Sequence, residues 1–126
     1  MQVDYEVFEK HLPETISWED EAFSFCEFRG IEAEGLHITS VFLDCILDRC
    51  DLYLTLFNSA TFVGVGFKDC DFRGCSYPGC RFVECVFENC RFTADKLGGA
   101  CRFDNSRWYA CTQRDTHGLS ADLAPA

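Results

Sequence analysis

The sequence predicts an all-β solenoid, in which short strands stack coil upon coil around an apolar interior. Three observations predict it. Large apolar residues recur at every fifth position, a small or β-branched residue stands two positions before all of them except Leu97, which has Asp95 there, and the other positions are mostly polar or glycine. A spacing of five matches neither the helical period of 3.6 nor the strand period of 2, so the repeat itself is the structural unit.

The large apolar positions run without a break through the middle of the chain. Within one unit, the two inward residues lie two apart, as on one face of a short extended segment. We expect the core to consist of this series and its continuation after Gly98-Gly99: Phe42, Leu47, Leu52, Phe57, Phe62, Phe67, Phe72, Tyr77, Phe82, Phe87, Phe92, Leu97, Phe103 and Trp108.

Cysteine is the commonest residue in the small position. The chain holds ten cysteines and no C-x-x-C pair, so the usual zinc-ribbon and thioredoxin signatures are absent. A regular step of five is typical of a core position filled by a small apolar residue, not of a disulfide framework. We expect reduced, buried, structural thiols. The alternative is a soft-metal site along the column Cys50, Cys70 and Cys90, with Cys111 above it.

The units Cys70-Asp71-Phe72 and Cys50-Asp51-Leu52 resemble those of the pentapeptide repeat proteins, whose unit is a small residue, Asp or Asn, Leu or Phe, and two free positions. The resemblance covers residues 40–111, with a looser lead-in from Phe23. It implies a right-handed quadrilateral β-helix with four faces and twenty residues per coil, here with four to five coils. Residues twenty apart should then stack in apolar columns.

Three segments are expected along the chain: an N-terminal cap at 1–20, the repeat β-helix at 21–114 and a C-terminal tail at 115–126. Val3-Tyr5-Val7 alternates like a strand, but Val3, Val7, Phe8 and Leu12 would also share one side of a short helix ended by Pro13. Either structure would cap the open end of the solenoid.

Two places interrupt the repeat. Residues 31–41 do not keep phase with the units after them, and their register stays open. Gly98-Gly99 is interpreted as a one-residue bulge at a corner, which would place Phe103 over Phe82 and Trp108 over Phe87. In the tail, Leu119 and Leu123 are expected to fold over the last coil.

Charge is distributed unevenly along the chain. The net charge is −10, and residues 1–51 hold 13 acids and 3 bases, whereas residues 52–126 hold 8 of each. This balance disfavours direct nucleic-acid binding, which requires a basic surface. The acidic end could attract a basic partner or simply confer solubility. No apolar run reaches the ~18 residues of a membrane helix, and the first residues lack signal-peptide features, so we expect a cytoplasmic protein without membrane contact.

Little in the sequence points to catalysis. His11, His37 and His117 are far apart and outside the regular repeat, and there is no phosphate-binding glycine motif. We expect no enzymatic activity, no cofactor and no metal.

The best surface candidate is apolar. The outward positions place Leu43, Val63 and Val83 in one column beside Ile46 and Val86, and a contiguous apolar patch often marks a partner site. A terminal segment could instead cover it. We expect a non-enzymatic protein-binding module with an unidentified protein partner, and a homodimer is a further possibility. The resemblance implies an alternative: an acidic DNA mimic that modulates DNA gyrase or another type II topoisomerase, as quinolone-resistance members do.

Overall fold

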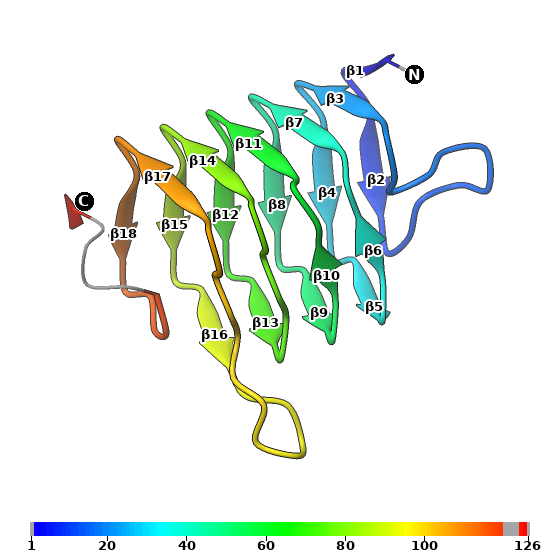
Figure 1. Ribbon diagram of the computed structural model, residues 1–126. Coiled ribbons are helices and arrows are strands. Elements are labelled where there is room, and N and C mark those ends of the chain that lie inside the picture. Colours follow the sequence, from blue (N-terminus) through cyan, green and yellow to red (C-terminus); the bar gives the residue numbers. More distant parts are fainter. Residues whose placement is uncertain (1, 120–123, 126) are drawn as a thin grey trace.

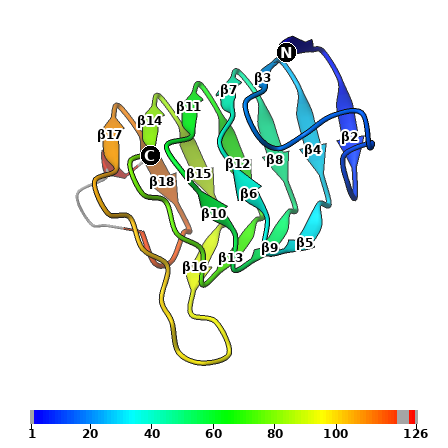
Figure 2. The ribbon, with the colours of Figure 1, turned by 45° about the vertical axis from the view of Figure 1, so that its right-hand side comes forward.

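The computed structural model describes residues 2–119 and the backbone of residues 124–125. The chain forms a right-handed quadrilateral β-helix of about five turns, with parallel strands stacked along one axis and the two termini at opposite ends (Figures 1 and 2). The predicted fold class is confirmed. No helix in the described part of the chain is long and apolar enough to cross a membrane.

Four faces, here called A to D, surround the core. Face A contains β1 (Gln2–Asp4), β3 (Ala22–Ser24), β7 (Val41–Leu43), β11 (Thr61–Val63), β14 (Arg81–Val83) and β17 (Arg107–Tyr109). Face B contains β2 (Val7–Glu9), β4 (Glu27–Arg29), β8 (Ile46–Asp48), β12 (Gly66–Lys68), β15 (Val86–Glu88), β18 (Thr112–Arg114) and β19 (Ala124–Pro125).

The other two faces are less extensive. Face C contains β5 (Glu32–Glu34), β9 (Asp51–Tyr53), β13 (Asp71–Arg73) and β16 (Arg91–Thr93). Face D contains β6 (His37–Ile38) and β10 (Leu56–Phe57), and single bridges continue it through Ser76 to Arg102.

Aromatic rings stack in columns inside the faces. On face A, the centroids of Phe42 and Phe62 lie 4.9 Å apart, and those of Phe62 and Phe82 lie 5.1 Å apart, with rings within 7° of parallel. Each such pair adds about 0.5–1.5 kcal/mol beyond the area that it buries. The structure buries all of the following predicted core residues: Phe42, Leu47, Leu52, Phe57, Phe62, Phe67, Phe72, Tyr77, Phe82, Phe87 and Phe92.

Left-handed backbone at most corners turns the chain from one face to the next. At these corners the second residue after the central one has positive φ, as at Asp44 (51°), Gly64 (65°) and Leu54 (53°), whereas Ser40 and Ala94 do not. Glycine adopts this conformation without strain, and Asp or Asn tolerates it better than other side chains. The polar and glycine content of the free positions follows from these turns.

Leu97 is not a core residue, contrary to the prediction: it is 97% exposed. Residues 94–100 leave the coil as a loop that Asp95 closes. Its carboxylate accepts hydrogen bonds from the amides of Leu97 and Gly99, both at 2.8 Å. The coil that runs from Phe82 to Trp108 is consequently six residues longer than the coil from Phe62 to Phe82.

The predicted register after Gly98-Gly99 is therefore wrong by one face. Phe103 stacks on Tyr77 with a centroid distance of 4.7 Å, and Trp108 stacks on Phe82 at 4.1 Å. Both residues are half-buried and pack against the end of the core.

The register of residues 31–41 is resolved by a shortened corner. Ala33 pairs with Leu52 and Ile38 with Phe57, so both fill central positions. Only two residues, Thr39 and Ser40, separate β6 from β7. The buried Ser40 hydroxyl donates a hydrogen bond to the Trp18 carbonyl at 2.8 Å, which stabilises the short corner.

The N-terminal segment forms strands, not the helix left open by the sequence. β1 pairs with β3 and β2 pairs with β4, so residues 2–9 already belong to the first coil, ahead of the predicted boundary at residue 21. Residues 10–21 form a loop whose half-buried Leu12, Ile16 and Trp18 pack against the core. At the other end Leu119 packs against the core, while Leu123 lies outside the described residues.

Candidate functional site

An apolar ribbon runs along the corner between faces A and B. We define it by Leu43, Ile46, Val63, Val83 and Val86. Strand pairing places Val63 between Leu43 and Val83 on face A, and it places Gly66 between Ile46 and Val86 on face B. The predicted column on face A is thus continuous across three coils, whereas Gly66 leaves a gap in the column on face B.

Strand alternation turns the ribbon outward. In β11, β12 and β15 the central phenylalanine is buried, and its neighbours on both sides point to solvent because successive side chains alternate. Ile46 is 43% exposed and Val86 is 44% exposed. Neither is covered by a segment in the described ranges 2–119 and 124–125, so the alternative that a terminal segment covers the ribbon finds no support there.

Carboxylates interrupt the ridge of the ribbon. The corner residues between its two columns are Asp44, Gly64 and Glu84, all with positive φ. The Asp44 side chain lies against Gly64, where there is no Cβ to displace it. The surface therefore combines apolar side chains on faces A and B with two acids, Asp44 and Glu84, at the corner between these faces.

Two exposed aromatic residues extend the same corner toward the N-terminus. Tyr5 is 75% exposed and Phe25 is 50% exposed, and their rings stack at 5.0 Å and 5° from parallel. Sequence reasoning missed them because the register of the first coils was not assigned. A signal existed: Phe25 stands directly before Cys26, in an outward position where the repeat does not need an aromatic residue.

The ten cysteines are free, and all except the half-buried Cys101 are buried. Their thiols donate hydrogen bonds to backbone carbonyls of the preceding coil, as from Cys70 to Leu47 at 3.3 Å and from Cys85 to Phe62 at 3.3 Å. Burial raises the pKa of Cys45 to about 11. This thiol is therefore protonated and unreactive at neutral pH. The pKa of Cys101, in contrast, is lowered to about 7 by a hydrogen bond from Cys75.

Cys111 stands over Cys85 and not over Cys90, which corrects the predicted cysteine column. The longer coil shifts it by one face, and Thr116 takes the place above Cys90, where its hydroxyl accepts a hydrogen bond from the Cys90 amide at 3.3 Å. In the described residues, no group of three or more His, Cys, Asp or Glu side chains is placed to hold a metal ion.

Within the described residues, the contacts found for His11, His37 and His117 do not include a nucleophilic hydroxyl or thiol side chain. His37 Nδ1 lies 3.2 Å from Glu19 Oε1, and His11 Nδ1 lies 3.2 Å from the Leu12 carbonyl oxygen. His117 contacts β16 through its backbone.

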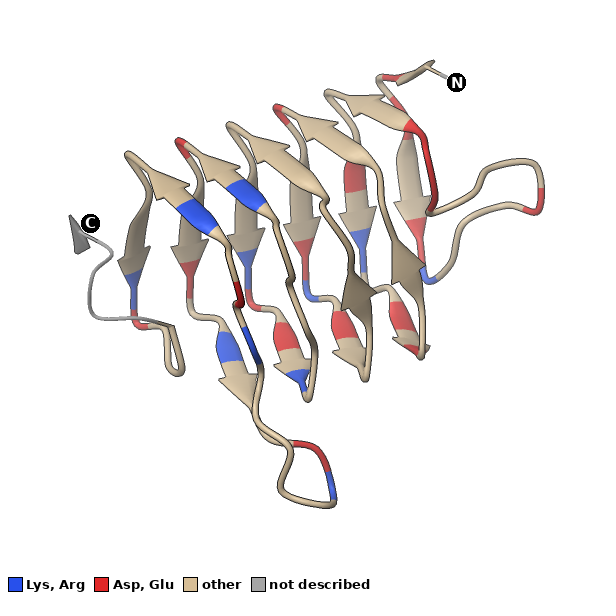
Figure 3. Ribbon diagram, viewed as in Figure 1, with Lys and Arg blue, Asp and Glu red and all other residues tan. Residues whose placement is uncertain are grey.

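The balance of acidic and basic residues changes along the axis of the solenoid. Acidic positions gather on the N-terminal coils, whereas Lys and Arg recur on β14, β16 and β17 (Figure 3). The ribbon crosses from the acidic part toward the mixed part.

Comparisons with known proteins agree with this architecture. The family model for pentapeptide repeats matches residues 42–74 and 66–100, with eight copies, and the chain is a pentapeptide repeat protein. No curated protein sequence matches it. Its fold is similar to that of the pentapeptide repeat protein Rfr23 from the cyanobacterium Cyanothece 51142, with a TM-score of 0.51, 10% identity and coverage of 91% of this chain and 82% of that one.

A second similar structure is trypsin-treated QnrB1 R167E, described as a plasmid-mediated fluoroquinolone resistance protein. The TM-score is 0.35 at 11% identity, with coverage of 92% of this chain and 69% of that one. At this similarity the match carries no argument about function.

Proposed function

We propose that this chain is a non-enzymatic protein-binding module whose apolar ribbon docks a partner protein. The observation that carries the proposal is the unbroken apolar column on face A, which Ile46 and Val86 flank on face B. Outward positions on the other faces hold Asp, Glu, Arg and Thr without loss of the fold, so the solenoid itself does not require Leu43, Val63 and Val83 to be apolar. A cytoplasmic setting would also keep the ten thiols reduced.

The ribbon also specifies the chemistry of its partner. Apolar contact would bury Val63 and Val83, and the stacked Tyr5 and Phe25 would extend that contact. A basic group facing Asp44 or Glu84 would offset the desolvation of these carboxylates. The complementary surface is therefore apolar with basic residues, and it belongs either to another protein or to a second copy of this chain.

The test is the double variant Val63→Glu/Val83→Glu. We expect the fold to be retained with a loss of about 1 kcal/mol in the free energy of unfolding, because strand pairing places the two glutamates opposite each other, where like charges repel. Association, measured by partner pull-down and by light scattering for self-association, should fall because two charges would be desolvated at the contact. The control Asn58→Glu/Thr93→Glu adds the same charge on faces D and C and should bind normally. If both double variants associate equally well, the ribbon is not the docking surface.

The DNA-mimic alternative draws no support from the distribution of charge. A mimic of duplex DNA presents an excess of acids along its whole length, whereas here the excess lies in residues 1–51, and residues 52–126 hold eight acids and eight bases (Figure 3). Binding through the ribbon needs no such distribution.

A further inference from the structure

The strand β5 lies at an open edge of face C. It pairs with β9 on one side only. In the next coil, the Asp51 amide donates to the Ile31 carbonyl and the Tyr53 carbonyl accepts from the Gly35 amide, both at 2.8 Å. By the repeat, the corresponding amide of Glu32 and carbonyl of Glu34 point toward the N-terminal end, where no strand in the described part of the chain pairs with them.

The first coil leaves this edge uncovered. β1 and β2 cover β3 and β4, but residues 10–21 contain no strand that covers β5. Beside β6, the Trp18 carbonyl accepts a hydrogen bond from the Thr39 amide at 3.1 Å. In Figure 1 residues 10–21 form a wide loop at the N-terminal end of the coils. An unpaired strand edge is a ready template for an added strand, because its backbone donors and acceptors are already aligned.

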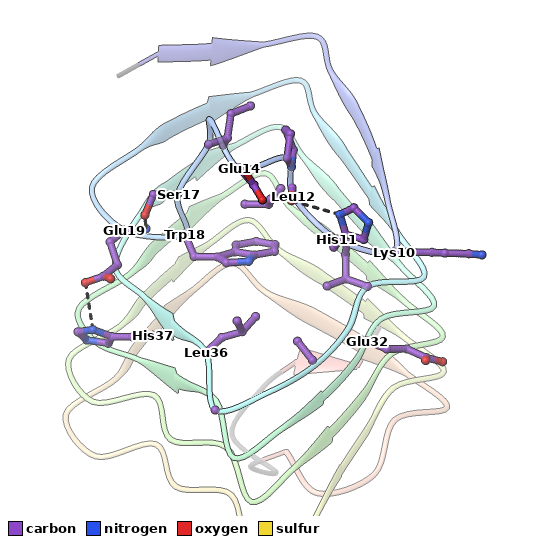
Figure 4. Close-up of a pocket in the computed structure, with 15 residues that line it drawn as sticks. Lys10, His11, Leu12, Glu14, Ser17, Trp18, Glu19, Glu32, Leu36 and His37 are labelled. Atoms are coloured by element: carbon purple, nitrogen blue, oxygen red, sulfur yellow. Dashed lines mark hydrogen bonds and ion pairs between the residues drawn. The ribbon is translucent and has the colours of Figure 1, made fainter.

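A cavity of about 560 Å³ adjoins the open edge, between the loop 10–19 and residues 31–37. Its apolar lining includes Ile31, Leu36 and Trp18, whose ring is held 5.4 Å from the Phe28 ring. Figure 4 shows Trp18 lying across the middle of this space, with Leu36 beyond it and Glu32 at one side. The space would take a bulky apolar side chain.

The surroundings of the cavity are acidic. Glu14, Glu19 and Glu32 line it, and Glu34 stands at the end of β5, with Lys10 the one lysine or arginine in the lining. Residues 1–51 as a whole hold 13 acids and 3 bases. A strand added here would meet a negative field, which favours a positively charged segment.

We propose that this end of the solenoid binds an extended basic peptide segment, which adds a strand to β5 and places one bulky apolar side chain in the cavity. Backbone hydrogen bonds to Glu32 and Glu34 would supply the alignment, the acids would select Lys or Arg, and the cavity would select the anchor. This site is separate from the ribbon, so either proposal can fail without the other.

The probes are three synthetic peptides, KVKXKVK with X as Leu, Phe or Trp, labelled for fluorescence polarisation. At least one should bind saturably with a Kd below ~100 µM. The acidic analogues EVEXEVE should not bind. Glu32→Lys/Glu34→Lys should weaken binding by about tenfold, whereas Glu84→Lys, at the distant corner, should change it less than about twofold. Chemical shifts in ¹⁵N spectra should change at the Glu32 amide and the Trp18 indole.

Backbone methylation tests strand addition without changing the protein. Alternate amides of a strand point to opposite edges, so methylating one alternate set should abolish binding and methylating the other set should not. The proposal is overturned if no peptide binds, if both methylated sets bind equally, if the Glu32→Lys/Glu34→Lys variant binds as well as the parent, or if the shifts map to the ribbon or to β17.

Discussion

Cysteine, serine and threonine in the small position of the repeat can contribute a hydrogen-bond donor as well as a small volume. Ser106 donates its hydroxyl to the Tyr77 carbonyl, and the Thr116 hydroxyl donates to Phe87, just as the Cys70 thiol donates to Leu47. Sequence reasoning treated this position as apolar because cysteine behaves as a small hydrophobe. The shared partner, a carbonyl of the coil before, becomes visible only when the coils are stacked.

Buried thiols predict a loss of stability at alkaline pH. Burial raises the pKa of Cys45 from 9.0 to about 11 and that of Cys80 to about 12. Since the folded-state pKa lies above the unfolded value, the protonated thiols contribute fully below pH 9, and this contribution is lost as pH rises toward 11–12. The melting temperature should therefore fall over this window.

Cys45→Ala/Cys80→Ala should flatten that fall, whatever its effect on the melting temperature at pH 8. Cys101→Ala serves as the control, because this half-buried thiol has its pKa lowered by a hydrogen bond from Cys75. Melting curves from pH 8 to 11.5 provide the measurement. If the melting temperature falls as steeply with pH in Cys45→Ala/Cys80→Ala as in the parent, the loss of stability does not come from these two thiols.

At the scale of elements, the five-residue period predicts which side chains point inward but not which face they occupy. The sequence predicts an insertion of one residue at Gly98-Gly99, whereas the loop at residues 94–100 inserts six. The two insertions differ by five residues, which is one full repeat unit. Both insertions leave Phe103 and Trp108 in central positions, so the periodicity cannot distinguish them. The distinction comes from local turn chemistry at Asp95, whose carboxylate closes a loop.

The same argument separates the two candidate sites. The ribbon could be predicted because it lies in the regular coils, where residues twenty apart stack. The Tyr5–Phe25 pair and the open edge of β5 could not, because both depend on the register of the first two coils. That register contains the shortened corner at Thr39-Ser40, which is fixed by a hydrogen bond to Trp18.

A ladder of alternating charge runs along face B in the register that the structure shows. The outward residues that follow the central ones pair in the order Glu9, Arg29, Asp48, Lys68, Glu88 and Arg114. Arg114 lies 3.1 Å from Glu88, and Arg29 lies 3.7 Å from Glu9. Each charge has neighbours of opposite sign. A strand paired one coil away from its observed partner would instead face a charge of its own sign, so the ladder favours the observed stacking.

Lys68→Glu should therefore destabilise the solenoid, because the introduced carboxylate would stand between Asp48 and Glu88. We expect a loss of about 1 kcal/mol in the free energy of unfolding, measured by urea denaturation at low salt. The loss should shrink in 0.5 M NaCl, where the Debye length falls to roughly half its physiological value. Asn58→Glu, which adds a charge outside the ladder, should cost much less, and equal losses at both salt concentrations would speak against the ladder.

At the scale of the whole molecule, the solenoid is a short rod whose excess negative charge lies at its N-terminal end. About five turns at ~4.8 Å give a rod of only ~25 Å, with its excess negative charge at one end. We expect this rod to leave supercoiling by purified DNA gyrase unchanged at micromolar concentration, with or without a quinolone. A gel assay of supercoiled plasmid measures this, and robust inhibition or protection would favour the DNA-mimic alternative.

Site-specific photo-crosslinking tests the central claim, that the ribbon is a protein-binding surface, most directly. A photo-reactive amino acid at position 63 lies in the middle of the ribbon, and the same group at position 58 lies on face D. We predict a discrete crosslinked protein, or a crosslinked dimer, from position 63 only, and its loss when Val83→Glu is added. Crosslinks of equal yield from both positions, or none from position 63 in cells of the native host, would contradict the claim.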